Sequence, residues 1–225
     1  MKKTERFFFT LKRYRWGRFI YQRAKDTFEL VYELSPSTPK HLRKILSVEG
    51  KITPSECSLL FELASQVSSG CIIDIGSYRG RSTVALALGS LANGGVPVYA
   101  IDPHEPFKGI CGGDFGPKDR IAFFKNVLRT DVGEVVRLVN LSSEVISKGW
   151  SREVALLWID GDHRYEAARR DFECWEPFVV KGGLIGFHDS INPGLGPGKV
   201  IAEAMPSGKF DKIMQVDLTT VLRKL

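Results

Sequence analysis

The sequence lacks the features that define several familiar classes of protein. No two of its four cysteines have C-x-x-C spacing, which argues against a zinc site of that pattern and against a disulfide framework. No hydrophobic run approaches the ~20 residues of a membrane span, and the start of the chain lacks the apolar core of a signal peptide. We therefore interpret the cysteines as reduced thiols in or near the core and expect a cytoplasmic protein. The four cysteines are Cys57, Cys71, Cys111 and Cys174.

Positive charge is concentrated at one end of the chain. The protein has 225 residues, 43% of them hydrophobic, which is enough for one buried domain with a small extension. Residues 1–25 hold nine Lys or Arg against Glu5 alone, a balance of +8, whereas the whole chain carries +6. The remaining residues are therefore close to neutral, and the basic character belongs to the N-terminus.

The basic N-terminal segment is interleaved with aromatic side chains, and this leaves two interpretations open. The segment could lie on an anionic membrane surface or bind a polyanion, although a nucleic-acid partner is not favoured. The favoured alternative is a helix that packs its aromatic side chains on its own domain or on a partner subunit of a homo-oligomer. Prolines at Pro36 and Pro39 break this segment, and Thr53 to Glu56 forms a capping-box pattern. We predict an extension over residues 1–52 and a domain over residues 53–225.

Short apolar runs alternate with helical patterns after this boundary. Such alternation predicts an α/β fold with a doubly wound, mostly parallel sheet. Two apolar runs a few residues apart at the end of the chain predict an antiparallel hairpin. The expected strands are Cys71–Ile75, Val98–Ile101, Val135–Val139, Ala155–Ile159, Leu184–Phe187, Phe210–Val216 and Thr219–Arg223, and the expected helices are Ser82–Leu91, Asp119–Leu128 and Tyr165–Trp175.

The first two strands end in polar residues suited to a cofactor. The first run ends at Asp74 and continues into a glycine-containing turn and a helix start, where backbone N–H groups are free to meet a ligand. The turn lacks G-x-G-x-x-G spacing, and a plain tight turn explains it nearly as well. Asp102 ends the second strand 28 positions later and could accept hydrogen bonds from a ribose, or simply cap a helix. The candidate cofactor-binding residues of the turn are Asp74, Gly76, Ser77, Gly80 and Ser82.

Two further strands end in carboxylates and imidazoles. Asp160, Asp162 and His163 follow one strand, and His188 and Asp189 follow the next. Such a group could bind Mg²⁺ or Mn²⁺, and a metal-bound hydroxyl would lose its proton more readily to a nearby base. A structural explanation is also available, in which Asp162 and His163 cap the following helix and His188 binds a buried carbonyl.

These strand-end residues together resemble one family. They are Asp74 to Ser82, Asp102, Trp158 to Tyr165, Lys181 to Gly183, and His188 with Asp189. Over roughly Ile52 to Leu225, the chain resembles class I S-adenosylmethionine-dependent methyltransferases, most closely the macrocin-type sugar O-methyltransferases. The resemblance implies a Rossmann-like, seven-stranded sheet with its last strand antiparallel.

The resemblance also implies roles for individual residues. Asp74 and Gly76 would lie beside the methionine part of the cofactor, Asp102 would bind its ribose, and Ser142 would lie near its adenine. The family more often has glycine at the position of Asn140.

A related group, the catechol and caffeoyl-CoA O-methyltransferases, suggests the metal ligands and the base. Their metal ligands correspond to Asp160, which we also count as a cofactor contact, and to the pair His188 and Asp189. They have lysine at the position of His163, and usually an acid at the position of His188. The base is therefore either His163 or Asp162.

The sequence thus predicts an S-adenosylmethionine-dependent methyltransferase that acts on a hydroxyl of a small molecule or sugar, with metal assistance as an option. One alternative is a nicotinamide-dependent dehydrogenase, against which the missing G-x-G-x-x-G argues. Another is a non-catalytic binding module that acts through its basic N-terminus.

Overall fold

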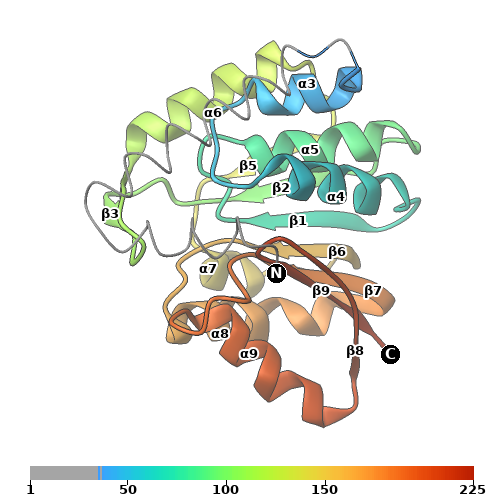
Figure 1. Cartoon of the computed structure of the whole chain (residues 1–225), viewed down its shortest axis with the longest axis vertical. Coiled ribbons are helices and arrows are strands. Elements are labelled where there is room, and N and C mark those ends of the chain that lie inside the picture. The colour runs from blue at the N-terminus through green and yellow to red at the C-terminus, as the bar shows by residue number, and fades with distance from the viewer. Residues whose placement is uncertain (1–34, 36) are drawn as a thin grey trace.

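A computed structural model describes residue 35 and residues 37–225, which form a seven-stranded sheet with helices on both faces (Figure 1). The strands of this sheet are β1 (Cys71–Ile75), β2 (Val98–Ile101), β5 (Val136–Val139), β6 (Val154–Ile159), β7 (Val179–Phe187), β8 (Phe210–Val216) and β9 (Thr219–Lys224). A separate hairpin pairs β3 (Phe107–Lys108) with β4 (Asp114–Phe115). The α-helices are α3 (Lys40–Leu46), α4 (Pro54–Ser65), α5 (Arg81–Leu91), α6 (Pro117–Arg129), α7 (Ser143–Ser147), α8 (Tyr165–Trp175) and α9 (Gly196–Ala204). Two short 3₁₀ helices are η1 (Glu176–Phe178) and η2 (Met205–Ser207).

The order of the strands in the sheet is β5-β2-β1-β6-β7-β9-β8. The first five strands of this order are parallel, and β9 runs antiparallel between β7 and β8. The predicted fold class and the predicted C-terminal hairpin are therefore confirmed. The chain leaves β1 toward β2 on one side and reaches β6 on the other, so β1 and β6 flank the point where the strand order reverses.

Alternate residues of each strand enter opposite cores. Ile72 packs in a cluster with α3, α4, α5 and α6, whereas Ile73 packs in a second cluster with α8 and α9. Because successive side chains of a strand point to opposite faces, the nearly continuous apolar runs are those of a sheet that is covered on both sides. The two groups of helices lie on either side of the strands in Figure 1.

Strand β7 begins earlier than the sequence pattern predicts. It starts at Val179 instead of Leu184, with Val179 paired to Val154 and a register shift between Val154 and Leu156. Lys181 and Gly182 are exposed within it and interrupt the apolar run. A prediction based on hydrophobic runs therefore recognises only the second half of this strand.

Helix α3 belongs to the same hydrophobic core as α4 and α5. Leu42, Ile45 and Ile52 are buried in it, and the buried Arg81 of α5 donates to the carbonyl oxygens of Val48 and Ile52 at 2.6 and 3.1 Å. The predicted boundary between residues 52 and 53 thus falls inside one packed unit. The basic segment of residues 1–25 lies outside the described residues, and both interpretations of it stay predictions.

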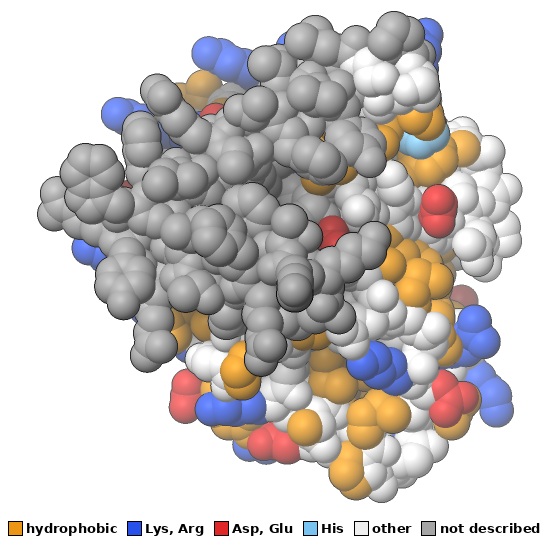
Figure 2. All heavy atoms as spheres, in the orientation of Figure 1, with side chains coloured by type: hydrophobic (Ala, Val, Ile, Leu, Met, Phe, Trp, Pro, Cys, Tyr) orange, Lys and Arg blue, Asp and Glu red, His pale blue; other side chains and the backbone are white. Residues whose placement is uncertain are grey.

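Charges of both signs share the described surface. Figure 2 shows hydrophobic side chains interspersed with Lys, Arg, Asp and Glu on the described part of one face. This mixture agrees with the nearly neutral balance of the chain after residue 25. None of the helices within residues 37–225 has both the length and the hydrophobicity needed to cross a membrane.

Candidate active site

A cavity of about 550 Å³ lies where the carboxyl ends of β1, β2, β6 and β7 meet the β3–β4 hairpin. Ligands of doubly wound sheets bind at this edge, beside the reversal of strand order. Ten of the twelve predicted site residues line the cavity: Gly76, Ser77, Ser82, Asp102, Ser142, Asp160, Asp162, His163, His188 and Asp189. Asp74 and Gly80 are not among the lining residues.

Gly76 sets the distance between the ends of β1 and β6. Its φ is +86°, and a Cβ at this position would lie 2.2 Å from the carbonyl oxygen of Asp160. Only glycine combines this backbone conformation with so close an approach. The turn therefore brings the cofactor motif against the strand that carries Asp160.

We expect Gly76→Ala to cost several kcal/mol of unfolding free energy, because positive φ and a backbone clash add together. Gly94→Ala is the matched control, since Gly94 has φ +87° but no atom within 4 Å of the place that the added methyl group would take. The control should cost only about 1–2 kcal/mol, the strain of a left-handed residue. Denaturant unfolding of both variants measures the difference, and equal losses would show that the contact with Asp160 does not matter.

Asp74 supports the turn from behind the cavity. Its carboxylate is completely buried and accepts hydrogen bonds from the hydroxyls of Ser82 and Thr83 in the first turn of α5. Burial raises its pKa from 3.8 to about 7, although the two hydroxyls act in the opposite direction. Asp74 thus fixes the helix start that borders the cavity.

The raised pKa of Asp74 predicts a pH-dependent stability. The folded state holds this proton more tightly than the unfolded state, so the unfolding free energy should fall as the pH rises from about 4 to 7. Asp74→Asn cannot ionise and should escape this loss. Its stability relative to the parent should therefore increase by roughly 3–4 kcal/mol over that range. Urea unfolding at several pH values measures this, and parallel curves for the two proteins would contradict it.

Asp102 and Ser77 form the cofactor side of the cavity. The Asp102 carboxylate accepts the backbone N–H groups of Tyr78 and His104, each at 2.8 Å, and retains lone pairs for a ligand. Asn140 donates to the carbonyl oxygens of Asp102 and Pro103, which ties the ends of β5 and β2 together. Among the described residues, the buried hydroxyl of Ser77 has no hydrogen-bond partner. An unpaired buried hydroxyl in a cavity wall suits a polar ligand.

Carboxylates and imidazoles alternate along the opposite side of the cavity. His188 lies between Asp160 and Glu56, with Nδ1 at 2.9 Å from Asp160 Oδ1 and Nε2 at 3.6 Å from Glu56 Oε2. His163 lies between Asp160 and Asp189, with Nε2 and Nδ1 each 3.2 Å from a carboxylate oxygen. We call these five residues the carboxylate–imidazole chain.

The charges in this chain stabilise one another. Burial alone would lower the pKa of His163, but the carboxylates of Asp160 and Asp189 outweigh burial and raise it to about 12. Burial would likewise raise the pKa of Asp160, but the nearby charge of His188 and a hydrogen bond from His163 lower it to about 2. The pKa of His188 also lies well above its ordinary value because of Asp160 and Glu56, despite desolvation. The raised pKa values of both rings favour their protonated, imidazolium forms.

Asp162, the other candidate base, is engaged elsewhere. Its carboxylate accepts the side chain of Arg164 at 2.7 Å and the backbone N–H of Arg164 at 3.2 Å. This pairing lies before the helix and does not cap it: the N-cap of α8 is Arg164, and no side chain accepts a hydrogen bond from the first turn, so the predicted capping role of Asp162 is wrong. Of the two candidates, His163 is the one within the carboxylate–imidazole chain.

The described donors do not fit a hard cation such as Mg²⁺. Oδ1 of Asp160 already faces both His163 and His188, and Asp189 pairs with His163. His188 stands where an oxygen ligand is expected, and both of its ring nitrogens face carboxylates. Because Mg²⁺ prefers a set of oxygen ligands, a set in which His188 supplies a ring nitrogen fits this cation poorly.

Sequence reasoning missed two residues of this site. Glu56 was interpreted only as part of a capping box with Thr53, which it does form, and its contact with His188 has no local signal. Cys111 was interpreted as a thiol in or near the core, but it is exposed and lines the cavity. Its surroundings gave a weak signal, because residues 103–119 form a glycine-rich segment long enough for a lid or substrate wall, although a mobile surface loop explains the segment as well.

A doubly wound sheet with a polar cavity at its strand-order reversal defines a cofactor-binding α/β enzyme. Residues 73–190 match the family Methyltransf_24, a methyltransferase domain. This match covers more than half of the chain, and the protein therefore belongs to that family. The predicted methyltransferase is confirmed, and neither the dehydrogenase nor the non-catalytic module is favoured.

Solved structures share the fold at low sequence identity. A methyltransferase from Podospora anserina, bound to SAH (S-adenosylhomocysteine), is 15% identical with a TM-score of 0.64, over 91% of this chain and 96% of that one. An O-methyltransferase from Bacillus cereus in complex with SAH is 16% identical with a TM-score of 0.64, over 87% and 95% of the two chains. A TDP-rhamnose 3′-O-methyltransferase of calicheamicin biosynthesis is 15% identical with a TM-score of 0.61, over 90% and 94%.

Proposed function

We propose that this protein transfers a methyl group from S-adenosylmethionine to a hydroxyl of a small molecule, with a sugar as the favoured acceptor class. The observation that carries the proposal is one cavity that joins Asp102 and the unpaired Ser77 hydroxyl to the carboxylate–imidazole chain. Two structural neighbours were solved with SAH, and one is named as a methyltransferase of a nucleotide sugar, which supports this choice of cofactor and acceptor.

The cofactor side of the cavity suits the parts of S-adenosylmethionine. Asp102 would accept hydrogen bonds from the ribose hydroxyls, and Ser77 with the start of α5 would meet the methionine part. Ser142 precedes α7 and lines the cavity beside the end of β5, which suits a contact with the adenine. When bound, this cofactor supplies an electrophilic methyl group.

His163 is the proposed base. It would accept the proton of the acceptor hydroxyl as the oxygen attacks the methyl group in line. Because Asp160 and Asp189 hold a proton on His163 at neutral pH, only enzyme with neutral His163 reacts by this route. The same carboxylates make the neutral ring a stronger base, and they fix its orientation toward the cavity.

The β3–β4 hairpin forms a wall on the acceptor side. Arg164 donates to the carbonyl oxygen of Lys108 at 3.3 Å and lies over the ring of Phe107 at 5.5 Å. Phe107 lines the cavity, and so does Asp162, the carboxylate that pairs with Arg164, so the wall combines aromatic surface with a charged group. Such a mixture suits a polar acceptor with one apolar face, as sugars have.

Ligand titration and product analysis test the proposal. Calorimetry should show binding of S-adenosylmethionine and no binding of NAD⁺ or NADH. The full-length protein with isotopically labelled S-adenosylmethionine and a panel of sugars, nucleotide sugars and phenols should then label a hydroxyl-bearing acceptor. Absence of S-adenosylmethionine binding, or label found on a nitrogen or carbon atom, would contradict the proposal.

A further inference from the structure

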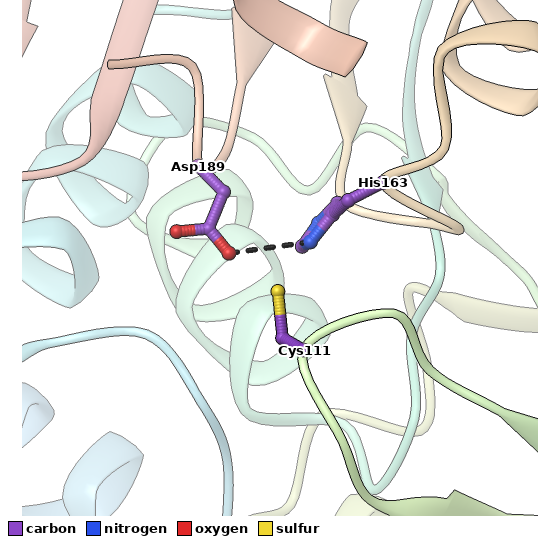
Figure 3. Close-up of side chains that lie close together, drawn as sticks. All are labelled: Cys111, His163 and Asp189. Atoms are coloured by element: carbon purple, nitrogen blue, oxygen red, sulfur yellow. Dashed lines mark ion pairs between the residues drawn. The ribbon is translucent and has the colours of Figure 1, made fainter. Parts of the chain in front are cut away.

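Cys111 lies beside His163 and Asp189 in the active site, although it is far from both in the sequence. It lies between β3 and β4, at the turn of the hairpin, and Figure 3 shows its thiol directed toward His163 and Asp189. One ligand atom from each of these three side chains lies within 4.8 Å of the other two. Thiol, imidazole and carboxylate thus converge from the hairpin, from the end of β6 and from the end of β7.

We propose that Cys111, His163 and Asp189 bind a borderline divalent cation such as Zn²⁺. Zinc takes sulfur, nitrogen and oxygen ligands in tetrahedral geometry, and three protein ligands leave a fourth position for water or substrate. Its bond lengths imply ligand atoms about 3.3–3.6 Å apart. His163 Nδ1 and Asp189 Oδ2 already lie 3.2 Å apart, so only a small adjustment of the thiol is required.

The surroundings of His163 match those of a zinc ligand. Nδ1 faces Asp189, while Nε2 lies 3.2 Å from Asp160, whose carboxylate can accept a hydrogen bond from the Nε2–H group. A carboxylate on the far nitrogen fixes the tautomer and the direction of a metal-bound imidazole. His188 in turn holds Asp160 at 2.9 Å, so this outer support is itself anchored.

The hairpin presents the thiol in a defined place. Arg164 ties the hairpin to the loop after β6 through Lys108 and Phe107. Gly109 and Gly113 close the turn with a backbone hydrogen bond of 3.2 Å, and Gly112 and Gly113 have positive φ. A bound ion would therefore join this wall of the cavity to the carboxyl edge of the sheet. Because the ion would occupy one nitrogen of His163 while Asp160 faces the other, His163 cannot act as the base in the metal-bound form.

The neighbouring cluster of Asp160, His163 and His188 is less suitable. It contains no thiol, and His188 is buried, whereas Cys111 is exposed and supplies the sulfur ligand that zinc favours. Binding at Cys111, His163 and Asp189 requires the loss of one proton from the thiol and one from the imidazolium, which solvent accepts. This site is distinct from the oxygen-ligand site that Mg²⁺ would need, although the two share Asp189.

Cobalt substitution tests the proposal independently of any methyl transfer. Under reducing conditions, full-length protein titrated with Co²⁺ should bind one ion and show the near-ultraviolet absorption of a cobalt–thiolate bond. Zn²⁺ should displace the cobalt and remove the absorption. Competition with a chromophoric chelator then gives the affinity.

Matched cysteine variants decide between a site and adventitious binding. Cys111→Ser should abolish the cobalt–thiolate absorption and weaken Zn²⁺ binding by about 100-fold or more. Loss of a group that only hydrogen-bonds to a metal ligand already costs about 10–100-fold in affinity, and loss of a ligand should cost at least as much. Cys174→Ser, in α8 and outside the cavity, should behave as the parent does. Absence of metal binding by the parent, Co²⁺ binding without the thiolate absorption, or absorption that survives in Cys111→Ser would overturn the proposal. Thermal unfolding verifies that each variant is folded.

Discussion

Replacing His163 with glutamine is expected to lower kcat for methyl transfer by about 10²–10⁴-fold, the contribution of a positioned general base. Glutamine can keep one hydrogen bond to Asp160 or Asp189 but cannot accept the proton of the acceptor. The affinity for S-adenosylmethionine should stay within a few-fold of the parent, because His163 follows β6, which β1 separates from β2 and Asp102 in the sheet. Steady-state kinetics and calorimetry separate these two effects.

Asp162→Asn is the matched control for His163→Gln. Both residues line the cavity, but Asp162 pairs with Arg164 instead of joining the carboxylate–imidazole chain. We expect a change in kcat of less than about tenfold for this variant. A larger loss in Asp162→Asn than in His163→Gln would transfer the role of base to Asp162.

The pH profile of the parent gives a second readout for His163. Its raised pKa keeps the base protonated near pH 7, so kcat/KM should rise with pH, by up to tenfold per unit, well into the alkaline range. His163→Gln should lose this rise. A plateau that already begins near pH 7 would show that the carboxylates do not hold the proton on His163.

Replacing Asp102 with alanine is expected to weaken S-adenosylmethionine binding by about 1.5–3 kcal/mol, or about 10–150-fold. The reason is the loss of charge-assisted hydrogen bonds to the two ribose hydroxyls. The substitution also frees the N–H groups of Tyr78 and His104, so part of the loss will be local loosening of these two loops.

Ser77→Ala separates direct contact from loosening. The Ser77 hydroxyl is buried but has no partner within the described structure, so its removal should leave the unfolding free energy nearly unchanged. It should still weaken cofactor binding by about 1 kcal/mol if the hydroxyl binds the cofactor. Unchanged affinity in folded Asp102→Ala would remove Asp102 from the site, whatever Ser77→Ala does.

The sequence predicted the strand-end part of the site because a sheet imposes its own geometry. Parallel strands present their carboxyl ends at one edge, so Asp102, Asp160 and His188 had to lie near one another once the strands were recognised. The direction of Asp74 was not predictable in this way. Its burial depends on how α5 packs over β1, which brings Ser82 and Thr83 onto the carboxylate.

Contacts between distant segments account for the remaining differences. Glu56 reaches His188 because the start of α4 is bonded to the C-terminal hairpin at Leu218 and Thr219, and Cys111 reaches His163 because the β3–β4 hairpin folds over the strand ends. Both contacts join segments that no repeat or spacing connects. Composition and periodicity describe each segment alone, so they contain no information about these approaches.

The two roles of Glu56 have an evolutionary consequence. One oxygen of its carboxylate accepts the N–H of Thr53 and faces His188, and the other accepts Leu218 N–H and the Thr219 hydroxyl in the C-terminal hairpin. An acid at position 188 would bring two negative charges together between side chains that are both buried, which is costly. Lineages that exchange His188 for a carboxylate should therefore change Glu56 in the same step. We therefore expect residues 56 and 188 to change together. Because Glu56 also bonds the start of α4 and the hairpin of β8 and β9, substitutions there should change the effect of a substitution at either position.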